Sequence, residues 1–248
     1  MNETILSFLN KNNYDAITPK AVLFDMDGVL FDSMKNHALS WYRTVMELGI
    51  PCTREEFYLY EGQTGRQTIN QLIQRGFGRE ATDSEKSNIY ARKTAHFNSL
   101  PAPEVMPGAV EVLKLVKEMG LIPVLVTGSG QKSLIGKIET NFPGIFVRER
   151  MITAHDVHQG KPHPEPYLRG LEKAGVKPEE ALVIENAPLG VRSAAAAGIF
   201  TIAVNTGPLS EKLLYDEGAQ IVLSGMPELA ACFGEILKLL QETKRQPL

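Results

Sequence analysis

The 248-residue chain has the size and composition of an ordered globular protein. Hydrophobic residues make up 43% and charged residues 22%, both near the globular average, so the chain can bury a large core. The 26 basic and 29 acidic residues give a formal net charge of -3. This balance excludes a broad positive field for nucleic acid or an anionic membrane, so any phosphate site must be local.

The cysteines and the N-terminal residues indicate a cytoplasmic protein without disulfides. Cys52 and Cys232 are the two cysteines, and neither belongs to a Cys-x-x-Cys motif, which predicts reduced thiols. Residues 1–10 predict a short amphipathic helix, because they are too short and wrongly charged for a secretory signal. No run is long enough to span a membrane. We expect no membrane or nucleic-acid partner, and a monomer.

Short apolar runs that end abruptly at polar residues are typical of buried parallel strands. Such runs cover residues 20–24, 121–126, 181–184 and 200–204. Helical spacing is found in residues 109–119, 132–142, 166–174 and 191–197. Strands that alternate with helices predict an α/β fold, namely a Rossmann-like, doubly wound parallel sheet with helices on both faces.

One long segment after the first strand breaks this alternation, because its pattern is helical throughout. We expect a first helix at residues 37–48 and a second helix that begins at a capping box at 53–56. Two further helices are expected at 67–75 and 84–97. An inserted helical cap domain is therefore predicted at 34–101, and residues 1–33 and 102–248 form the catalytic core. The chain crosses between the two domains twice, and Pro101 and Pro103 suit a stiff hinge for cap closure.

Polar residues follow the predicted strands and should meet in one crevice, because ligands of doubly wound sheets bind beyond the carboxyl ends of the strands. These residues are Asp25, Asp27, Thr127, Ser129, Glu185 and Asn186. An isolated Asp-x-Asp is more often an exposed turn than a site. Its place at the end of an apolar strand favours a functional role.

Phosphate chemistry explains why the Asp-x-Asp-Gly motif stands at the end of the first strand. Phosphate monoesters are so inert that enzymes accelerate their hydrolysis up to ~10²¹-fold, so a site must neutralise charge and align a nucleophile. Asp25 can attack phosphorus and form an aspartyl-phosphate. Asp27 can protonate the leaving oxygen and then deprotonate the incoming one. Gly28 lets the backbone approach the phosphate closely.

The second polar loop is suited to bind phosphate oxygens. Thr127 offers a hydroxyl as a catalytic residue, and Gly128 and Ser129 offer backbone N–H and hydroxyl donors to the substrate. The alternative is an ordinary turn with a helix N-cap.

Two further segments complete the chemistry. Lys161 lies among three prolines and is a credible partner for Asp25 and the phosphate, although most lysines are solvated surface residues. Glu185 and Asn186 offer the oxygen ligands that Mg²⁺ prefers, with a helix cap as the alternative.

In this order, the motifs resemble the four motifs of the haloacid dehalogenase superfamily over nearly the whole chain, including the helical insertion. The resemblance implies a phosphatase or phosphomutase of the β-phosphoglucomutase-like branch, with Asp25 as nucleophile and Asp27 as general acid/base. It also implies Mg²⁺ held by Asp25, the Asp27 carbonyl, Glu185 and Asn186. Dehalogenation is not expected, because that reaction does not need the second aspartate.

Asn186 departs from the Glu-Asp pair that is usual in this branch. A unit-charge pair at about 4 Å is worth roughly 4 kcal/mol at an effective dielectric near 20, so the lost charge needs compensation. Glu61, in the cap loop that reads the substrate, is the candidate metal ligand and substrate contact. This combination is similar to a bacterial inorganic pyrophosphatase of the same superfamily. The alternative is a solvated Glu61 at a helix end.

Two other cap residues are candidate substrate contacts. His37 stands where mutases of this branch have a histidine that helps the acid/base aspartate, and an interfacial helix histidine is the alternative. Arg66 follows the glycine of the cap loop, displaced by one position from the arginine of β-phosphoglucomutases. Three further histidines are interpreted as loop residues rather than zinc ligands: His155, His158 and His163.

These residues predict a Mg²⁺-dependent phosphatase that acts on a small phosphorylated substrate, either inorganic pyrophosphate or a sugar phosphate. The alternative is a β-phosphoglucomutase that interconverts β-glucose 1-phosphate and glucose 6-phosphate. The two differ in whether water or a bound sugar phosphate accepts the phosphoryl group from Asp25, and ~1.4 kcal/mol shifts that partition tenfold. A remote alternative is a non-catalytic phosphate-binding module.

Overall fold

A six-stranded parallel sheet forms the centre of the larger part of the molecule. The computed structural model describes residues 1–130 and 132–245. The strands are β1 (Ala21–Phe24), β2 (Ile122–Val126), β3 (Met151–Ile152), β4 (Ala181–Glu185), β5 (Phe200–Val204) and β6 (Ile221–Leu223). Their spatial order is β3-β2-β1-β4-β5-β6. This doubly wound, Rossmann-like order confirms the predicted fold class.

Helices cover both faces of the sheet, because alternate side chains of each buried strand point to opposite faces. Val22 and Phe24 of β1 join a cluster with α1 (Asn2–Asn12), α5 (Ala109–Glu118) and α11 (Met226–Glu242). Ala21 and Leu23 join a second cluster with α8 (Glu165–Ala174) and α9 (Pro188–Ala196). β1 is therefore buried from both sides and holds the chain that follows it in a fixed place.

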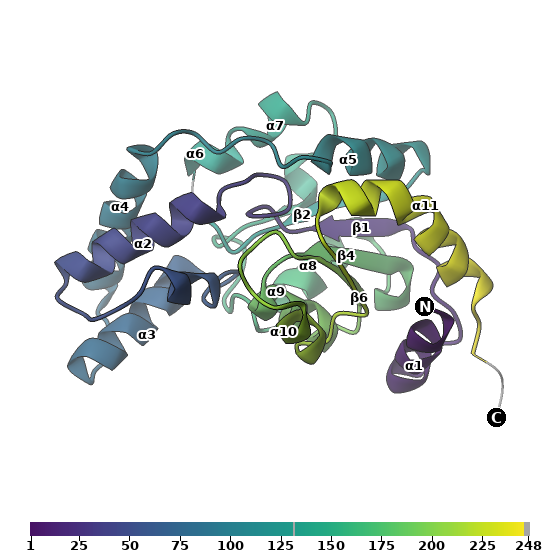
Figure 1. The fold of residues 1–248 in the computed structure, drawn as a ribbon, viewed down its shortest axis with the longest axis horizontal. Coiled ribbons are helices and arrows are strands. Elements are labelled where there is room, and N and C mark those ends of the chain that lie inside the picture. The colour runs from purple at the N-terminus through teal and green to yellow at the C-terminus, as the bar shows by residue number, and fades with distance from the viewer. Residues whose placement is uncertain (131, 246–248) are drawn as a thin grey trace.

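The inserted segment forms a separate helical layer with its own apolar core. It contains α2 (Met34–Glu47), the 3₁₀ turn η1 (Glu55–Tyr58), α3 (Gly65–Phe77) and α4 (Asp83–Asn98). Trp41, Val45, Phe57, Ile69 and Leu72 lie in its core. Figure 1 shows α2, α3 and α4 grouped on one side of the molecule, away from the two ends of the chain. This layer forms the cap over the sheet edge.

The structure adds elements that the sequence did not predict. β3 and β6 are edge strands of two and three residues, too short for a recognisable apolar run, and α10 (Glu211–Asp216) and α11 were also missed. The helix expected at 132–142 is two short helices, α6 (Lys132–Ile135) and α7 (Ile138–Asn141). Gly136 lies at the break, which fits the cost of about 1 kcal/mol for glycine inside a helix.

The capping box predicted at 53–56 is wrong as the start of a helix. Thr53 Oγ1 accepts from the backbone N–H of Glu56 at 3.3 Å, but only the four-residue turn η1 follows. Complete capping boxes occur at the two cap helices that follow, where Thr64 pairs with Gln67 and Thr82 pairs with Glu85. The local pattern is the same, but η1 is too short to continue as a helix.

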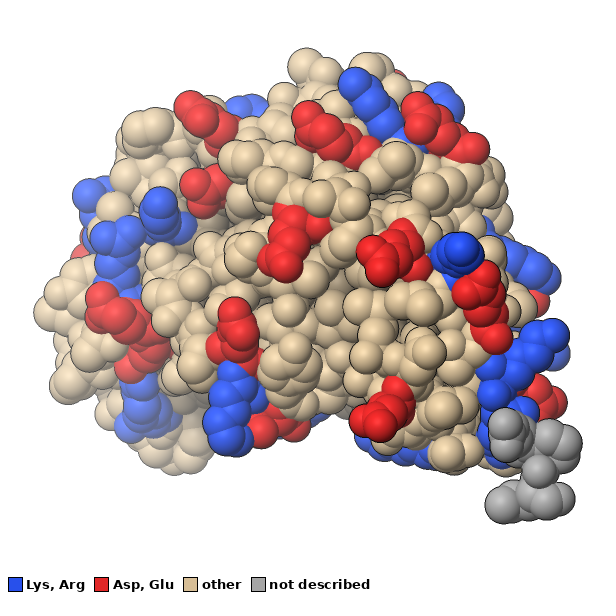
Figure 2. Space-filling model, turned by 45° about the vertical axis from the view of Figure 1, so that its right-hand side comes forward, with Lys and Arg blue, Asp and Glu red and all other residues tan. Residues whose placement is uncertain are grey.

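The surface carries charges of both signs. On the face shown in Figure 2, acidic and basic side chains are intermixed and no broad area of one sign appears. Within the described residues, every helix is too short or too polar to cross a bilayer.

We expect Thr82→Ala to destabilise the cap more than Thr53→Ala does. Thr82 Oγ1 accepts from Glu85 N at 3.2 Å, and Glu85 Oε2 accepts from Thr82 N at 2.8 Å, so the substitution removes an N-cap of a 16-residue helix. Loss of such a cap costs about 1 kcal/mol. Urea unfolding of both variants measures the difference, and an equal or larger loss for Thr53→Ala contradicts it.

Candidate active site

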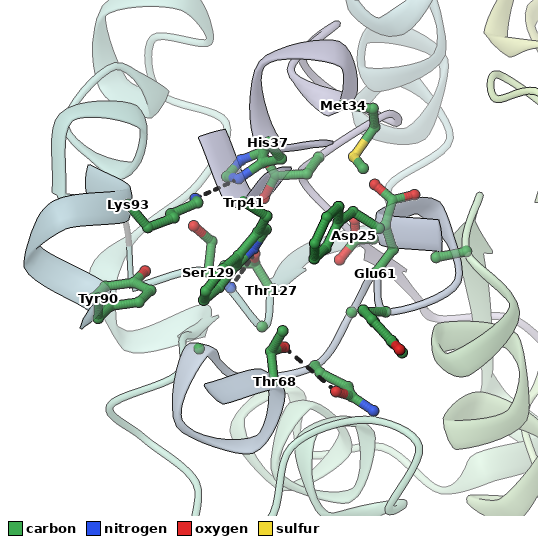
Figure 3. A pocket seen from close by; sticks show the side chains of 18 residues that line it. Asp25, Met34, His37, Trp41, Glu61, Thr68, Tyr90, Lys93, Thr127 and Ser129 are labelled. Carbon is green, nitrogen blue, oxygen red and sulfur yellow. Dashed lines mark hydrogen bonds and ion pairs between the residues drawn. The ribbon is translucent and has the colours of Figure 1, made fainter. Parts of the chain in front are cut away.

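The carboxyl ends of the central strands converge on a small cavity of about 60 Å³ under the cap (Figure 3). Asp25 directly follows β1, and Thr127 directly follows β2. Both line the cavity together with Asp27 and Ser129. Residues of α2, α3 and α4 line its other side. The cavity lies where the strand order predicts a ligand, in the crevice next to β1.

Lys161 is completely buried and connects the loops that follow the central strands. Its ammonium donates to Asp25 Oδ1 at 2.6 Å, Glu185 Oε1 at 2.6 Å and the Val126 carbonyl at 3.1 Å. Burial by itself lowers the pKa of Lys161, but the two carboxylates outweigh burial and raise that pKa above its usual value. The ammonium therefore keeps its charge, and its three N–H groups all have acceptors.

Asp25 lies in a place that disfavours its ionised form. Burial raises the pKa of Asp25 to about 8, Lys161 opposes this rise, and the neighbouring Glu185 and Asp27 carboxylates add to it. A further cation beside Asp25 would favour the carboxylate that a nucleophile requires.

The Glu185 carboxylate is fully occupied by donors of the protein. Besides Lys161, Oε1 accepts from the Tyr167 hydroxyl at 2.9 Å. Oε2 accepts from the backbone N–H groups of Asn186 at 2.8 Å and Ala187 at 3.0 Å. The sequence predicted Glu185 as a metal ligand. In the structure its oxygens accept hydrogen bonds from Lys161 and from the backbone N–H groups just before α9.

Asp27 belongs to a chain of hydrogen bonds that leads into the cap. Its Oδ1 accepts from Ser33 Oγ at 2.6 Å and lies 2.9 Å from His37 Nε2. Burial raises the pKa of Asp27, but His37 and Ser33 outweigh burial and lower it below its usual value. His37 Nδ1 lies 2.7 Å from Lys93 Nζ, as the dashed line in Figure 3 marks. The structure thus brings the predicted His37 to the predicted Asp27.

Lys93 is a site residue that the sequence analysis missed. It is 2% exposed on α4, and its ammonium lies 4.9 Å from the Phe97 ring centroid and 5.6 Å from that of Trp41. Burial lowers the pKa of Lys93 to about 7, although Asp27 opposes the shift. The spacing of Tyr90, Lys93 and Phe97 on one helix face was the one available signal, because such spacing surrounds a lysine with aromatic rings.

The cap loop brings Glu61 to the core. Glu61 Oε1 is shielded from solvent and has no hydrogen-bond partner among the described residues. Burial raises the pKa of Glu61 well above its usual value, and Asp25, Asp27 and Glu185 add to this effect. Next to Glu61, the Gly62 carbonyl lies so close to Gly128 that a Cβ on Gly128 would come within 2.1 Å of it. The structure therefore has a closed cap with an unpaired acid that lines the same cavity as Asp25.

The oxygen atoms around Asp25 fit a magnesium ion. Asn186 Oδ1, like Glu61 Oε1, is buried without a hydrogen-bond partner in the described part of the chain. Gly28, with a φ of 85°, leaves room for Asn186, since a Cβ there would lie 2.0 Å from Nδ2. Within residues 1–130 and 132–245, His, Cys, Asp and Glu side chains alone form no metal-binding group. An ion here therefore needs the Asn186 amide or a backbone carbonyl, both of which suit Mg²⁺.

The second polar loop is held partly by the cap. Thr127 Oγ1 accepts from the backbone N–H of Ser129 at 3.0 Å. The N–H of Gly130 donates to the hydroxyl of Tyr90, on α4, at 3.2 Å. Tyr90 was not identified from the sequence, because only cap closure brings it to this loop.

Arg66 lies outside the catalytic cavity. It is exposed at the start of α3 and pairs with Asp83 on the cap surface. The structure therefore does not bring this predicted substrate contact into the cavity that Asp25 lines. The other expected substrate contacts line the catalytic cavity: His37, Glu61, Gly128 and Ser129.

The fold therefore combines a buried Asp25–Lys161 pair at the end of the first strand with an inserted helical cap. Residues 22–204 match the model of the haloacid dehalogenase-like hydrolase family, and the chain belongs to this family.

Curated relatives include hexitol phosphatase A of Escherichia coli, 31% identical over 75% of this chain and 83% of the relative. The beta-phosphoglucomutase of Bacillus subtilis is 26% identical over 76% of this chain and 84% of the relative. A solved structure described as "Putative beta-phosphoglucomutase from Bacteroides vulgatus" is 51% identical, with a TM-score of 0.93 over 97% of this chain and 98% of that one. The chain is therefore an enzyme of the β-phosphoglucomutase-like branch of the family.

We expect Lys93→Met to remove part of the pH dependence of stability. Lys93 has a depressed pKa of about 7 in the folded protein and binds its proton more tightly when unfolded, so its contribution to stability rises from pH 7 to pH 10. Between pH 7 and 9 the variant should lose up to about 3 kcal/mol of this rise, since one proton contributes roughly 1.4 kcal/mol per pH unit.

Urea unfolding at both pH values measures the effect. Lys238→Met is the control, because Lys238 is 74% exposed on α11 and should leave the pH dependence unchanged. A Lys93→Met protein with the wild-type slope contradicts the prediction.

Proposed function

We propose that this enzyme is a Mg²⁺-dependent phosphatase that hydrolyses inorganic pyrophosphate through an aspartyl-phosphate on Asp25. The observation that carries the proposal is that Glu61, with a shielded and unpaired Oε1, lines the same cavity as Asp25 under the closed cap. A carboxylate at this position repels the phosphate group of a sugar phosphate. It can also bind Mg²⁺, and a compact substrate such as pyrophosphate can bind the same ion. A coarser form of the proposal, phosphoryl transfer from a small phosphorylated substrate, follows from the family.

The size of the catalytic cavity supports a compact substrate. Its volume of about 60 Å³ is far below the roughly 300–1,000 Å³ of pockets that enclose drug-sized ligands. Gly62 against Gly128 leaves no room to enlarge it while the cap stays closed. Pyrophosphate has no carbon skeleton to accommodate, whereas a hexose phosphate requires a larger closed space.

The oxygen atoms around Asp25 would hold the metal ion. Its ligands would be Asp25, the Asp27 carbonyl, Asn186 and Glu61, and Glu185 would position Lys161. When bound, Mg²⁺ supplies positive charge that offsets the negative charge of the transferred phosphoryl group. Glu61 restores the charge that Asn186 lacks in comparison with a Glu-Asp pair.

The side chains of the cavity divide the reaction between them. An Asp25 oxygen bonds to phosphorus as the bond from phosphorus to the leaving oxygen breaks, and Asp27 gives its proton to that oxygen. Asp27 then takes a proton from water, whose oxygen attacks phosphorus and releases orthophosphate from Asp25. Lys161, with Thr127 and Ser129, stabilises charge on the phosphoryl oxygens. The bound phosphate anion favours the protonated Asp27 that the first step requires.

A sugar-phosphate reaction is the second candidate. It is favoured by the similarity to hexitol phosphatase A and to the beta-phosphoglucomutase of Bacillus subtilis, and by the contact of His37 with Asp27. A sugar-phosphate phosphatase would pass the phosphoryl group from Asp25 to water, whereas a mutase would pass it to a bound sugar phosphate.

The decisive experiment compares kcat/KM for pyrophosphate, β-glucose 1-phosphate and a hexitol phosphate with Mg²⁺ present. We expect pyrophosphate to exceed the others at least tenfold, and Asp25→Asn to abolish turnover. Formation of glucose 6-phosphate from β-glucose 1-phosphate at a higher kcat/KM than pyrophosphate hydrolysis would reject the pyrophosphatase in favour of the mutase.

Glu61→Gln should weaken the metal site. Loss of one anionic ligand is expected to raise the Mg²⁺ concentration for half-maximal activity at least tenfold, and chelator should abolish the activity of the wild type. Glu55→Gln, at an exposed position of the same cap segment, is the matched control. Titration of both variants with Mg²⁺ measures the shift, and equal Mg²⁺ requirements exclude Glu61 from the metal site.

A further inference from the structure

A second, larger hollow lies between the cap and the core, beside the catalytic cavity. We call it the outer basin, and its volume is about 680 Å³. Its cap side consists of residues of α3 and α4, and its core side consists of Gly130 and parts of the loop 154–162. The mechanism proposed for Asp25 uses none of the basic side chains of this basin.

Tyr90 separates the outer basin from the catalytic cavity and lines both. Its hydroxyl accepts from Gly130 N at 3.2 Å, and its ring lies against Gly65, where an added Cβ would come within 2.3 Å of the ring. Farther along the cap–core contact, Gln67 Nε2 donates to the Gly160 carbonyl at 3.4 Å. In the closed structure these contacts make the outer basin a separate site rather than an extension of the catalytic cavity.

The ionisable side chains of the outer basin are all basic. Arg66 and Lys86 come from the cap, and His155 and His158 come from the core, while none of the described residues that line the basin is an Asp or Glu. Lys86, His155 and His158 make no ion pair with any described residue, and Arg66 pairs with Asp83, outside the lining. The positive end of the α3 dipole lies on the same side, because α3 begins at Gly65.

We propose that the outer basin binds a small, multiply charged phosphorylated anion that bridges the cap and the core. The volume of about 680 Å³ lies within the range of small-molecule pockets and is too large for a single phosphate ion alone. The described lining residues include no acid, and both walls carry basic groups without an ion-pair partner among the described residues, so the basin favours a negatively charged ligand.

Such an anion stabilises the closed cap. Its contacts come half from α3 and α4 and half from the loop 154–162, so they are made together only when the cap is closed. A ligand that binds one of two conformations more tightly shifts the equilibrium toward it. The outer basin is therefore a regulatory site at which a bound anion favours cap closure. This effect does not depend on which substrate the catalytic cavity accepts.

The test uses the full-length Asp25→Asn protein with Mg²⁺, so that no probe is turned over. Isothermal titration with inorganic tripolyphosphate, and separately with adenosine 5′-monophosphate, distinguishes a bare phosphate chain from a phosphate ester. For at least one of these probes, we expect a binding event that weakens at least tenfold when Lys86→Gln and His155→Gln are added. Lys86→Arg should retain that event.

Controls separate the outer basin from the catalytic cavity and from misfolding. Lys238→Gln, on exposed α11, should leave every binding event unchanged, and unchanged melting temperatures establish that the variants fold. A binding event that is insensitive to Lys86 and His155 belongs to the catalytic cavity. The proposal is overturned if no event with either probe depends on this pair, or if the loss of binding is accompanied by a lower melting temperature of the variant.

Discussion

The contact on which the site depends is the buried Lys161 ammonium between Asp25 and Glu185. It joins the loop that follows β1 to the end of β4, and it also holds the last carbonyl of β2. Removing one partner of such a buried pair costs about 3–5 kcal/mol, because a charge remains buried without a counterion. The sheet therefore supplies a rigid frame in which Asp25, the Lys161 ammonium and the loop that follows β2 have fixed positions.

The cap adds selection and control to this rigid frame. Gly62 lies close against Gly128, and Glu61 adds an acid to the lining of the small closed cavity. The contact of Lys93 with His37 connects α4 to Asp27, and His37, a cap residue, lowers the pKa of that carboxyl group. Closure thus assembles the site as well as excluding water. The outer basin lies between the same cap and core, so a ligand bound there contacts both and favours the closed cap.

The sequence predicted the central strands and the polar residues at their ends well, because four or five consecutive apolar residues before a polar turn are a local signal. The edge strands β3 and β6 gave no such signal, since they contain two and three residues. The capping pattern at Thr53 has the same local form as those at Thr64 and Thr82, yet only the last two begin long helices. Local hydrogen-bonding patterns start a helix, but packing decides its length.

The sequence by itself determined the order of strands, helical insertion and polar loops, and with it the set of side chains that Asp25 meets at the sheet edge. Only the tertiary structure decided how these side chains share their hydrogen bonds. It occupied the Glu185 carboxylate with four donors, paired Arg66 with Asp83, placed Lys93 beside His37 within the cap, and brought Tyr90 from the cap to Gly130 of the core. The physical reason is that strand ends follow from neighbours along the chain, whereas hydrogen-bond partners and desolvation depend on residues far apart in sequence.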